Sequence, residues 1–352
     1  MRTVDDLRHE THSAARQTVT LHGWGRHRVR SATFVQVQDT KTHSQIETRI
    51  SLDAPNLTRR HCIVWSKAQG LPMLKRLFGP RGVEVPVIGQ GTWQLEETDP
   101  RQVSRAIRAG IDLGLTHIDT AEMYGSGRVE ALVGVAINGR RDQVYLVSKV
   151  LPENASKRGV VGACEASLKR LGTDYLDCYL LHWPGQHPLE DTIAGFELLR
   201  EQRKISSWGV SNFNDRQLKQ AISIAGPGKV TCNQVLYHLN QRDIEQRVLP
   251  TCEANHIAVV GYTPFGRAKF PPVGVGGKAL LQIAAKHGCS ARQVALAFLT
   301  RRPSLFAIPK AVQPEHLVDN AGAAHVHLDF ADVSLLDKAF PVRGDPLEVP
   351  ML

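Results

Sequence analysis

Short apolar runs alternate with longer amphipathic stretches from about residue 84 to residue 322. The runs are continuous, which indicates strands buried on both faces, as in a parallel sheet with helical crossovers. Each run is short enough for a strand and is followed by a stretch long enough for a helix. The predicted strands are Val85–Gly91, Thr116–Thr120, Val144–Val150, Tyr175–His182, Ser207–Ser211, Val230–Leu236, Ile257–Tyr262 and Leu305–Pro309.

The stretches between and after these strands predict helices. Pro100 suits a first helical turn, the segment 212–215 offers caps just after a strand, and Gly172 can end a helix. The predicted helices are Pro100–Leu113, Arg128–Ile137, Gly159–Leu171, Leu189–Gln202, Asp215–Ile224, Ile244–Ala254, Lys278–His287 and Pro314–Gly322.

Eight strand–helix units in about 250 residues are typical of an α/β chain folded as a (β/α)8 TIM barrel. The pattern alone leaves an open, doubly wound sheet as the alternative. Both architectures place their chemistry at the carboxyl ends of the strands. We therefore expect functional side chains where the apolar runs end.

Residues 1–72 have a different pattern, rich in Arg, His, Thr and Gln and without a strand–helix unit. Val19–Trp24 and Thr33–Gln38 are predicted strands. We accordingly divide the chain into an N-terminal extension, residues 1–72, and a barrel, residues 73–352.

Composition narrows the setting of the protein. The chain has 352 residues and a formal net charge of +9, which could attract an anionic cofactor or nucleic acid. It contains no apolar stretch of membrane-spanning length and no evident secretory signal near Met1. Six cysteines without a CxxC pair are typical of a reducing cytoplasm. The prediction is a cytoplasmic protein without a membrane partner.

Two glycine-rich segments resemble phosphate-binding motifs and fail on inspection. Gly125–Glu130 begins like GxGxxG but has Glu130 in place of the third glycine. Gly274–Lys278 resembles a P-loop, but Pro272 and Ala279 stand at two of its required positions. No metal-binding motif is found either, so we expect no metal site.

Four polar side chains follow the carboxyl ends of predicted strands: Asp119, Tyr124, Lys149 and His182. Each alone has an ordinary structural explanation, as a loop cap, a surface ring, a rim charge or a core histidine. Together they fall on one face of a barrel. A lysine beside a tyrosine is expected to lower the pKa of the phenol, and the aspartate would keep the lysine charged. Such a set could protonate a carbonyl oxygen while an external donor supplies hydride.

The residues around these positions resemble the aldo-keto reductases. The resemblance covers about Val83 to Phe340 and leans toward the bacterial methylglyoxal reductase and 2,5-diketo-D-gluconate reductase branch. Its motifs are Gly91–Trp93, Gly110–Gly114, His117–Gly125, Leu146–Lys149, Leu180–Pro184, Trp208–Phe213, Asn233–Val235 and Ile308–Lys310.

The resemblance implies roles for individual residues. Tyr124 matches the general acid, Lys149 and Asp119 the pair that tunes it, and His182 the residue that orients the carbonyl. The substrate pocket is expected to include Trp93, Tyr124, His182 and Trp183. The residues implied to contact the cofactor are Thr92, Trp93, Asp119, Ser211, Asn212, Gln234, Tyr262, Thr263, Phe265, Arg267, Ile308, Lys310, Ala311, His316 and Asn320.

Within this set, the resemblance places Ser211, Asn212 and Gln234 on the nicotinamide carboxamide and stacks Tyr262 on its ring. Lys310 matches the grip on the 2′-phosphate, which implies NADPH as cofactor. Ala311 and His316 depart from the serine and arginine often found there, so a weaker preference over NADH is expected.

The resemblance implies reduction of small aldehydes and ketones, such as 2-oxoaldehydes or keto sugars, by a monomeric enzyme. The alternative is a cofactor-binding regulatory subunit with little turnover.

Part of the extension, about residues 6–39, resembles the anticodon-binding OB domain of aspartyl-tRNA synthetases. Residues 1–72 could be a nucleic-acid-binding module or a disordered extension, or the protein could start at Met73.

Overall fold

The protein is described by a computed structural model, which covers residues 33–38, 45–50, 72–80, 82–344 and 349–351. Its chain divides into two compact units, Met1–Lys67 and Ala68–Leu352. In the first unit, β1 (Thr33–Gln38) and β2 (Gln45–Ile50) form an antiparallel pair. The predicted strand Thr33–Gln38 is therefore confirmed, while Val19–Trp24 lies outside the described residues.

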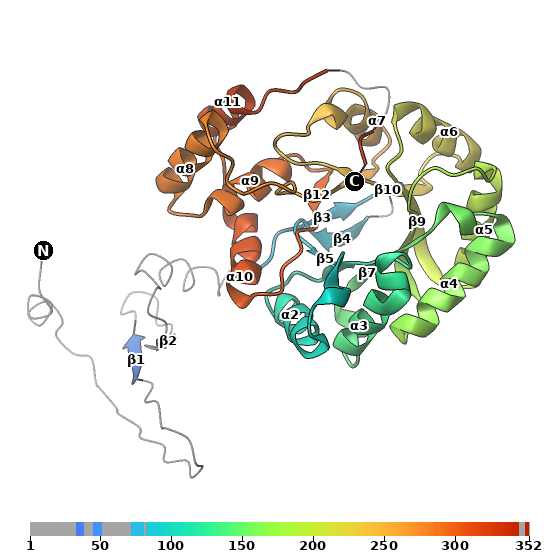
Figure 1. The fold of residues 1–352 in the computed structure, drawn as a ribbon, viewed down its shortest axis with the longest axis horizontal. Helices are drawn as coiled ribbons and strands as arrows, with labels where there is room; N and C mark the ends of the chain where they lie inside the picture. Colours follow the sequence, from blue (N-terminus) through green and yellow to red (C-terminus); the bar gives the residue numbers. More distant parts are fainter. Residues whose placement is uncertain (1–32, 39–44, 51–71, 81, 345–348, 352) are drawn as a thin grey trace, which may run out of the picture. The chain divides into compact units, whose positions relative to one another are not determined.

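The second unit is built on an eight-stranded parallel sheet whose order follows the chain from β5 to β12. A parallel bridge between Ile88 and Ala307 joins the two ends, and Gly89 N donates to Ala307 O at 2.8 Å. The sheet is thus curled into the predicted barrel (Figure 1). Its strands are β5 (Gln90–Gly91), β6 (His117–Asp119), β7 (Tyr145–Val150), β8 (Leu176–Leu181), β9 (Ile205–Ser211), β10 (Val230–Leu236), β11 (Ala258–Tyr262) and β12 (Leu305–Ala307).

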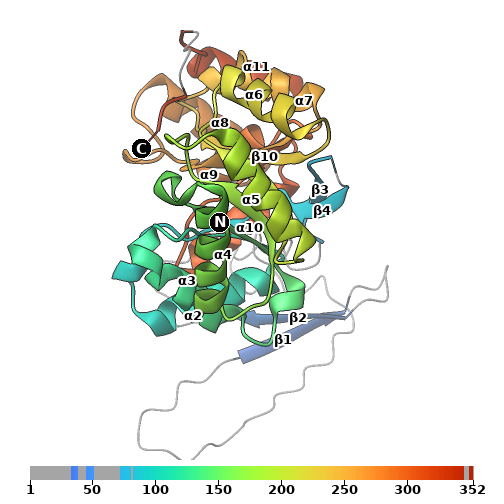
Figure 2. The same ribbon diagram turned by 90° about the vertical axis from the view of Figure 1, so that its right-hand side faces the viewer.

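Helices form an outer layer around these strands, as Figures 1 and 2 show. Asn214 caps α6 directly after β9 in a capping box with Gln217, and Gly172 ends α4 at a left-handed φ of 63°. The helices are α2 (Pro100–Asp112), α3 (Arg128–Ile137), α4 (Lys157–Leu171), α5 (Leu189–Glu201), α6 (Asp215–Ala225), α7 (Val248–Ala254), α8 (Val275–His287), α9 (Ala291–Leu299), α10 (Pro314–Gly322) and α11 (Phe330–Ala339).

A hairpin closes the amino-terminal end of the barrel. Its strands are β3 (Lys75–Phe78) and β4 (Val83–Pro86), paired antiparallel. The Phe78 ring packs edge-on against His117, Tyr145 and Phe306, which come from three different barrel strands. The prediction of one strand over Val85–Gly91 is therefore wrong at its start: the first part belongs to this hairpin, and only Gln90–Gly91 joins the barrel sheet.

Alternate strand residues face two different cores. Val147, Leu180 and Phe306 belong to the cluster that includes the hairpin residue Phe78, whereas their neighbours Leu146 and Leu181 pack in the cluster with the helices. Burial on both faces explains why the strands read as continuous apolar runs. Within the described residues, no helix is long and apolar enough to cross a membrane, and Cys164, Cys178, Cys232, Cys252 and Cys289 are free thiols.

Candidate active site

The carboxyl ends of consecutive strands bring the four predicted polar residues together. Asp119 is the last residue of β6, Lys149 lies near the end of β7, and His182 directly follows β8. Tyr124 begins the short 3-10 helix Tyr124–Gly127 after β6. The parallel register aligns these ends on one face of the barrel, as the pattern predicted.

An ion pair lies at the centre of the cluster. Lys149 Nζ is 2.6 Å from Asp119 Oδ1, and the two residues are 0% and 1% exposed. Lys149 Nζ also donates to Thr120 O at 2.8 Å and to the Tyr124 hydroxyl at 3.2 Å. An ammonium has three protons, so each of them has an acceptor. Lys149 is therefore held in one position, pointing at the phenol.

Burial raises the pKa of the Tyr124 hydroxyl, although Lys149 acts in the opposite direction. The expectation of a lowered pKa is thus wrong in sign, because the low-dielectric surroundings disfavour a phenolate more than the ammonium favours it. A raised pKa keeps Tyr124 in its protonated form near neutral pH. In that form it can act as a proton donor.

The lysine keeps its charge despite its surroundings. Burial alone would lower the pKa of Lys149, but Asp119 and Tyr124 outweigh it and raise the pKa above its ordinary value. The inference that Asp119 keeps the lysine protonated agrees with this direction.

His182 lies beside the phenol as a neutral ring. Its ring centroid is 5.8 Å from that of Tyr124 and 4.7 Å from that of Trp183. Burial, with a contribution from Lys149, lowers the pKa of His182 to about 2. Nδ1 is buried without a hydrogen-bond partner in the described structure. The imidazole can therefore orient an oxygen by hydrogen bonding but carries no positive charge at neutral pH.

A group of amide and hydroxyl side chains adjoins the ion pair at the ends of β9, β10 and β11. Asn212 Nδ2 donates to His182 O at 3.1 Å, and the Tyr262 hydroxyl donates to Asn212 Oδ1 at 2.9 Å. Ser211 Oγ donates to the backbone carbonyl of Gln234 at 2.9 Å. Such donors and acceptors suit a carboxamide, and the ring of Tyr262 is half-buried at the edge of the group. The donor set therefore fits a nicotinamide.

The loop after β11 contacts the loop after β5, the first strand of the barrel. The guanidinium of Arg267 lies over the ring of Trp93, 4.9 Å from its centroid, and that of Arg292 lies 4.5 Å over the ring of Phe265. Lys310 follows β12 with an exposed side chain.

The other residues implied to bind the cofactor differ in how exposed they are. Thr92, Ile308 and Asn320 are buried, whereas Thr263 and Ala311 are half-buried and His316 is exposed.

The structure adds contacts that the sequence could not show. The backbone carbonyl of Thr120 is a third acceptor for Lys149, and Thr92 Oγ1 donates to the backbone carbonyl of Asp119 at 2.8 Å. Gln234 Nε2 also donates to Asp119 Oδ2 at 2.7 Å. A backbone carbonyl is present in every residue, so the sequence cannot indicate which one accepts a hydrogen bond. Gln234 is 115 positions from Asp119, so their contact could not be predicted from sequence spacing.

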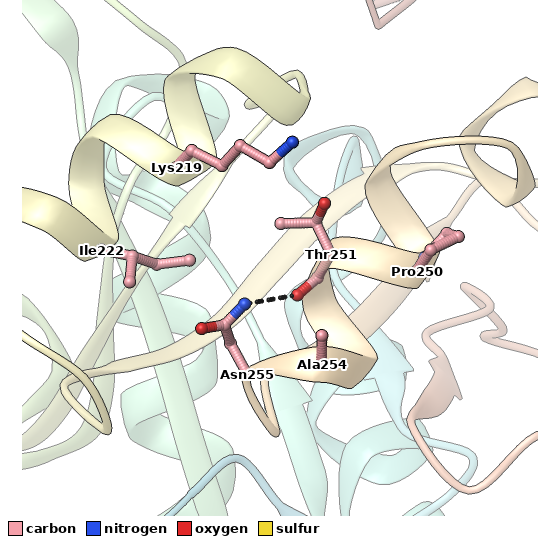
Figure 3. A pocket seen from close by; sticks show the side chains of 6 residues that line it. All are labelled: Lys219, Ile222, Pro250, Thr251, Ala254 and Asn255. Atoms are coloured by element: carbon pink, nitrogen blue, oxygen red, sulfur yellow. Dashed lines mark hydrogen bonds between the residues drawn. The ribbon is translucent and has the colours of Figure 1, made fainter.

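A hollow on the outside of the barrel lies between α6 and α7 (Figure 3). It has no acid–base pair comparable to Asp119 and Lys149 and shares no residue with the cluster. Its lining residues are Lys219, Ile222, Pro250, Thr251, Ala254 and Asn255. Across the described parts of the chain, no group of three or more His, Cys, Asp or Glu side chains could hold a metal ion.

Comparisons with known proteins agree with this geometry. Residues 87–340 match the Aldo/keto reductase family. Methylglyoxal reductase YeaE of Escherichia coli (strain K12) is 45% identical over 262 residues, which cover 74% of this chain and 92% of the relative.

Solved structures give the same result. The crystal structure of an aldo-keto reductase from Klebsiella pneumoniae in complex with NADPH is 41% identical, with a TM-score of 0.74, covering 80% of this chain and all of the other. A crystal structure of an aldo/keto reductase from Klebsiella pneumoniae in complex with NADP and acetate is 42% identical, with a TM-score of 0.75 and the same coverage. The chain therefore belongs to the aldo/keto reductase family.

Proposed function

We propose that the protein reduces small aldehydes and ketones to alcohols with NADPH, and that methylglyoxal-like 2-oxoaldehydes are among its substrates. The observation that carries the proposal is the hydrogen-bonded chain from the buried pair Asp119–Lys149 to Tyr124, beside the neutral ring of His182. The relationship to a methylglyoxal reductase and to an NADPH-bound aldo-keto reductase supports the substrate class and the cofactor.

Tyr124 acts as the general acid. A carbonyl oxygen placed between its hydroxyl and the His182 ring accepts hydrogen bonds from both. As negative charge develops on that oxygen, Tyr124 donates its proton, and Lys149 stabilises the phenolate that remains. The bound nicotinamide supplies the hydride for the carbonyl carbon. Because its pKa is lowered, His182 is neutral and orients the carbonyl oxygen without donating a proton to it.

Side chains along the rim of the barrel would hold the cofactor. Ser211, Asn212 and Gln234 would bind the carboxamide, and Tyr262 would pack against the nicotinamide ring. Lys310 is exposed after β12 and supplies a point charge for a 2′-phosphate. The remaining contacts are Thr92, Trp93, Thr263, Phe265, Arg267, Ile308, Ala311, His316 and Asn320. NADH is a weaker cofactor because Lys310 would lose its phosphate partner.

The substrate lies against aromatic side chains. Trp93 and Trp183 are half-buried, and the ring of Trp183 packs against that of His182. Flat apolar walls around a few polar groups suit a small carbonyl compound with one polar end.

Replacement of Tyr124 by phenylalanine tests the proposal. Tyr124→Phe removes one oxygen and should lower kcat/KM for methylglyoxal about 100-fold or more, since a positioned acid contributes at least that much. The measurement is NADPH consumption, with NADH in parallel. Tyr175→Phe is the matched control: this ring lies under the guanidinium of Arg141, just before β8 begins, and should keep the wild-type rate.

Two outcomes would contradict the proposal. Equal rates in Tyr124→Phe and the wild-type enzyme would remove the general acid from its assigned role. Tight NADPH binding without turnover of any aldehyde or ketone would instead indicate a cofactor-binding regulatory protein.

A further inference from the structure

The side chain of Gln234 joins the carboxamide-binding group to the ion pair. Its Nε2 donates to Asp119 Oδ2 at 2.7 Å, and the two residues are 2% and 1% exposed. The chemistry fixes the direction of the amide, because an ionised carboxylate only accepts hydrogen bonds. The NH2 group therefore faces Asp119, and the amide oxygen is left to accept from a carboxamide.

The two oxygens of Asp119 are divided between two partners. Oδ1 accepts from Lys149 at 2.6 Å, and Oδ2 accepts from Gln234. Two donors on different oxygens stop the carboxylate from rotating. Without the amide, Oδ2 would be a buried charged acceptor with no donor, which is costly in a low-dielectric site. Asp119 could then turn, and the lysine would no longer be aimed at the phenol.

We propose that Gln234 is a positioning residue for proton donation: its amide locks Asp119 so that Lys149 stays directed at Tyr124. This role comes in addition to contact with the cofactor, and it rests on the proposed function above. It makes the nicotinamide site and the proton-donating chain one hydrogen-bonded network, which runs Gln234–Asp119–Lys149–Tyr124.

Substitution by glutamate gives this role a pH signature. Gln234→Glu keeps the shape of the side chain but replaces the NH2 donor by a carboxyl group next to Asp119. When that group is protonated, its O–H can still donate to Oδ2. When it ionises, two carboxylates repel each other at hydrogen-bond distance. Activity should therefore be close to wild type at acid pH and fall as pH rises.

Two further variants complete the experiment, in which kcat and KM for NADPH are measured with methylglyoxal across pH. Gln234→Met removes the donor at every pH and should lower kcat about 10-fold throughout, the effect of losing one hydrogen bond to a charged group. Ser211→Ala removes another proposed carboxamide contact that does not touch Asp119. It should raise KM for NADPH without an added pH dependence.

The pH profile of Gln234→Glu decides the matter. If its kcat follows the wild type at every pH and only KM for NADPH changes, as in Ser211→Ala, Gln234 contacts the cofactor only and the proposal is wrong.

A second readout needs no turnover and so separates this proposal from the proposed function. Ultraviolet difference titration, with Tyr124→Phe as the blank, follows ionisation of the phenol in the full chain. Gln234→Glu adds a negative charge to the network and should move the ionisation of Tyr124 to higher pH, whereas Ser211→Ala should not. An unchanged titration in Gln234→Glu would overturn the proposal even if no carbonyl compound were reduced.

Discussion

Lys149 is the residue on which the geometry of the site depends. Its ammonium is fully buried and uses all three protons, on Asp119, the Thr120 carbonyl and Tyr124. A buried charge of this kind is tolerated because its partner lies at 2.6 Å. The proposed catalysis and the stability of the fold therefore depend on the same ion pair, and substitutions there should affect both.

Lys149→Met should show this double effect. The change leaves Asp119 buried without its counter-charge, which is expected to lower the free energy of unfolding by about 3–5 kcal/mol. The double variant Asp119→Asn, Lys149→Met removes both charges and should regain most of that stability, but not activity. Urea denaturation of both variants measures the difference. Equal destabilisation in the single and double variants would contradict the argument.

His117 is a buried titratable residue outside the cluster of Asp119, Tyr124, Lys149 and His182. Its ring packs edge-on against Phe78 and Tyr145, and neither ring nitrogen has a partner in the described part of the structure. Burial lowers the pKa of His117 to about 4. From the ordinary histidine range near 6.5 down to about 4, the unfolded chain binds the extra proton and the folded chain does not. Stability from this residue is therefore lost as pH falls through that window.

His117→Leu should make the fold less sensitive to acid. Between about pH 6.5 and 4, the free energy of unfolding of the wild type should fall more steeply than that of the variant, by about 1.4 kcal/mol per pH unit. Denaturation curves at several pH values measure both slopes. At a pH well above 6.5, where His117 is neutral in both states, the difference in free energy of unfolding between variant and wild type measures the packing change alone. Parallel slopes would show that His117 does not titrate on unfolding.

At the scale of elements, the apolar rhythm predicted the strands of the barrel because burial on both faces makes them continuous runs. It missed α9 (Ala291–Leu299) and α11 (Phe330–Ala339). Residues 293–299 of α9 are all buried, and Val294–Leu299 is a continuous apolar run no longer than a buried strand, so the sequence alone does not identify it as a helix. The error at Val85–Gly91 has a similar cause. Val85, Val87 and Ile88, at the end of the hairpin and just after it, are as buried and apolar as a barrel strand, and only tertiary pairing separates the two.

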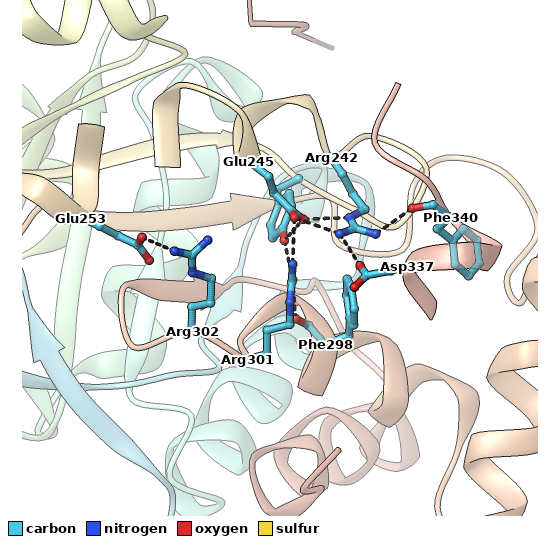
Figure 4. Close-up of polar contacts among 9 residues, drawn as sticks. Arg242, Glu245, Glu253, Phe298, Arg301, Arg302, Asp337 and Phe340 are labelled. Carbon is cyan, nitrogen blue, oxygen red and sulfur yellow. Dashed lines mark hydrogen bonds and ion pairs between the residues drawn. The ribbon is translucent and has the colours of Figure 1, made fainter. Parts of the chain in front are cut away.

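Arg242 links α11, the last helix, to the barrel through hydrogen bonds (Figure 4). It is 4% exposed and donates to Phe340 O and Asp337 Oδ1, both at 2.7 Å, at the end of α11. It also pairs with Glu245 at 2.8 Å, and Arg301 holds the same carboxylate at 2.8 Å. This network ties the loop after β10 and the end of α9 to the carboxyl-terminal helix.

Arg242→Met should loosen α11. The loss of a buried, multiply bonded charge is expected to lower the free energy of unfolding by about 3 kcal/mol or more. Amide hydrogen exchange should quicken mainly in α11. Lys204→Ala is the matched control: its pair with Glu165 is half-exposed, so its loss should cost no more than about 1 kcal/mol. Equal effects of the two substitutions would contradict the assigned role of Arg242.

Across the whole molecule, the site combines the ends of six strands that span residues 117–262. The sequence predicted which residues meet, because strand ends of a parallel barrel share one face. It could not predict that burial would outweigh Lys149 at the Tyr124 hydroxyl, or that Gln234 would hold Asp119. Both depend on distances and on the exclusion of water, which appear only when the barrel is assembled. The roles assigned to the cofactor contacts stay predictions.

The barrel unit should fold and function without the first unit. Ala68–Leu352 is compact by itself, and the family match lies within it. Its hairpin is needed, because Phe78 is 1% exposed and Arg76 Nη1 donates to the carbonyls of Thr300 and Arg302 at 2.6 and 2.7 Å.

Two truncations separate these contributions. A chain that begins at Ala68 should keep the melting temperature and the NADPH-dependent rate with methylglyoxal. A chain that begins at Gly82 lacks β3 and should lose about 3–5 kcal/mol, the cost of emptying a buried aromatic site. Thermal denaturation and the rate assay compare both with the full chain. If the chain from Ala68 melted as early as the chain from Gly82, residues 1–67 would contribute to the stability of the barrel, and the division into independent units would be wrong.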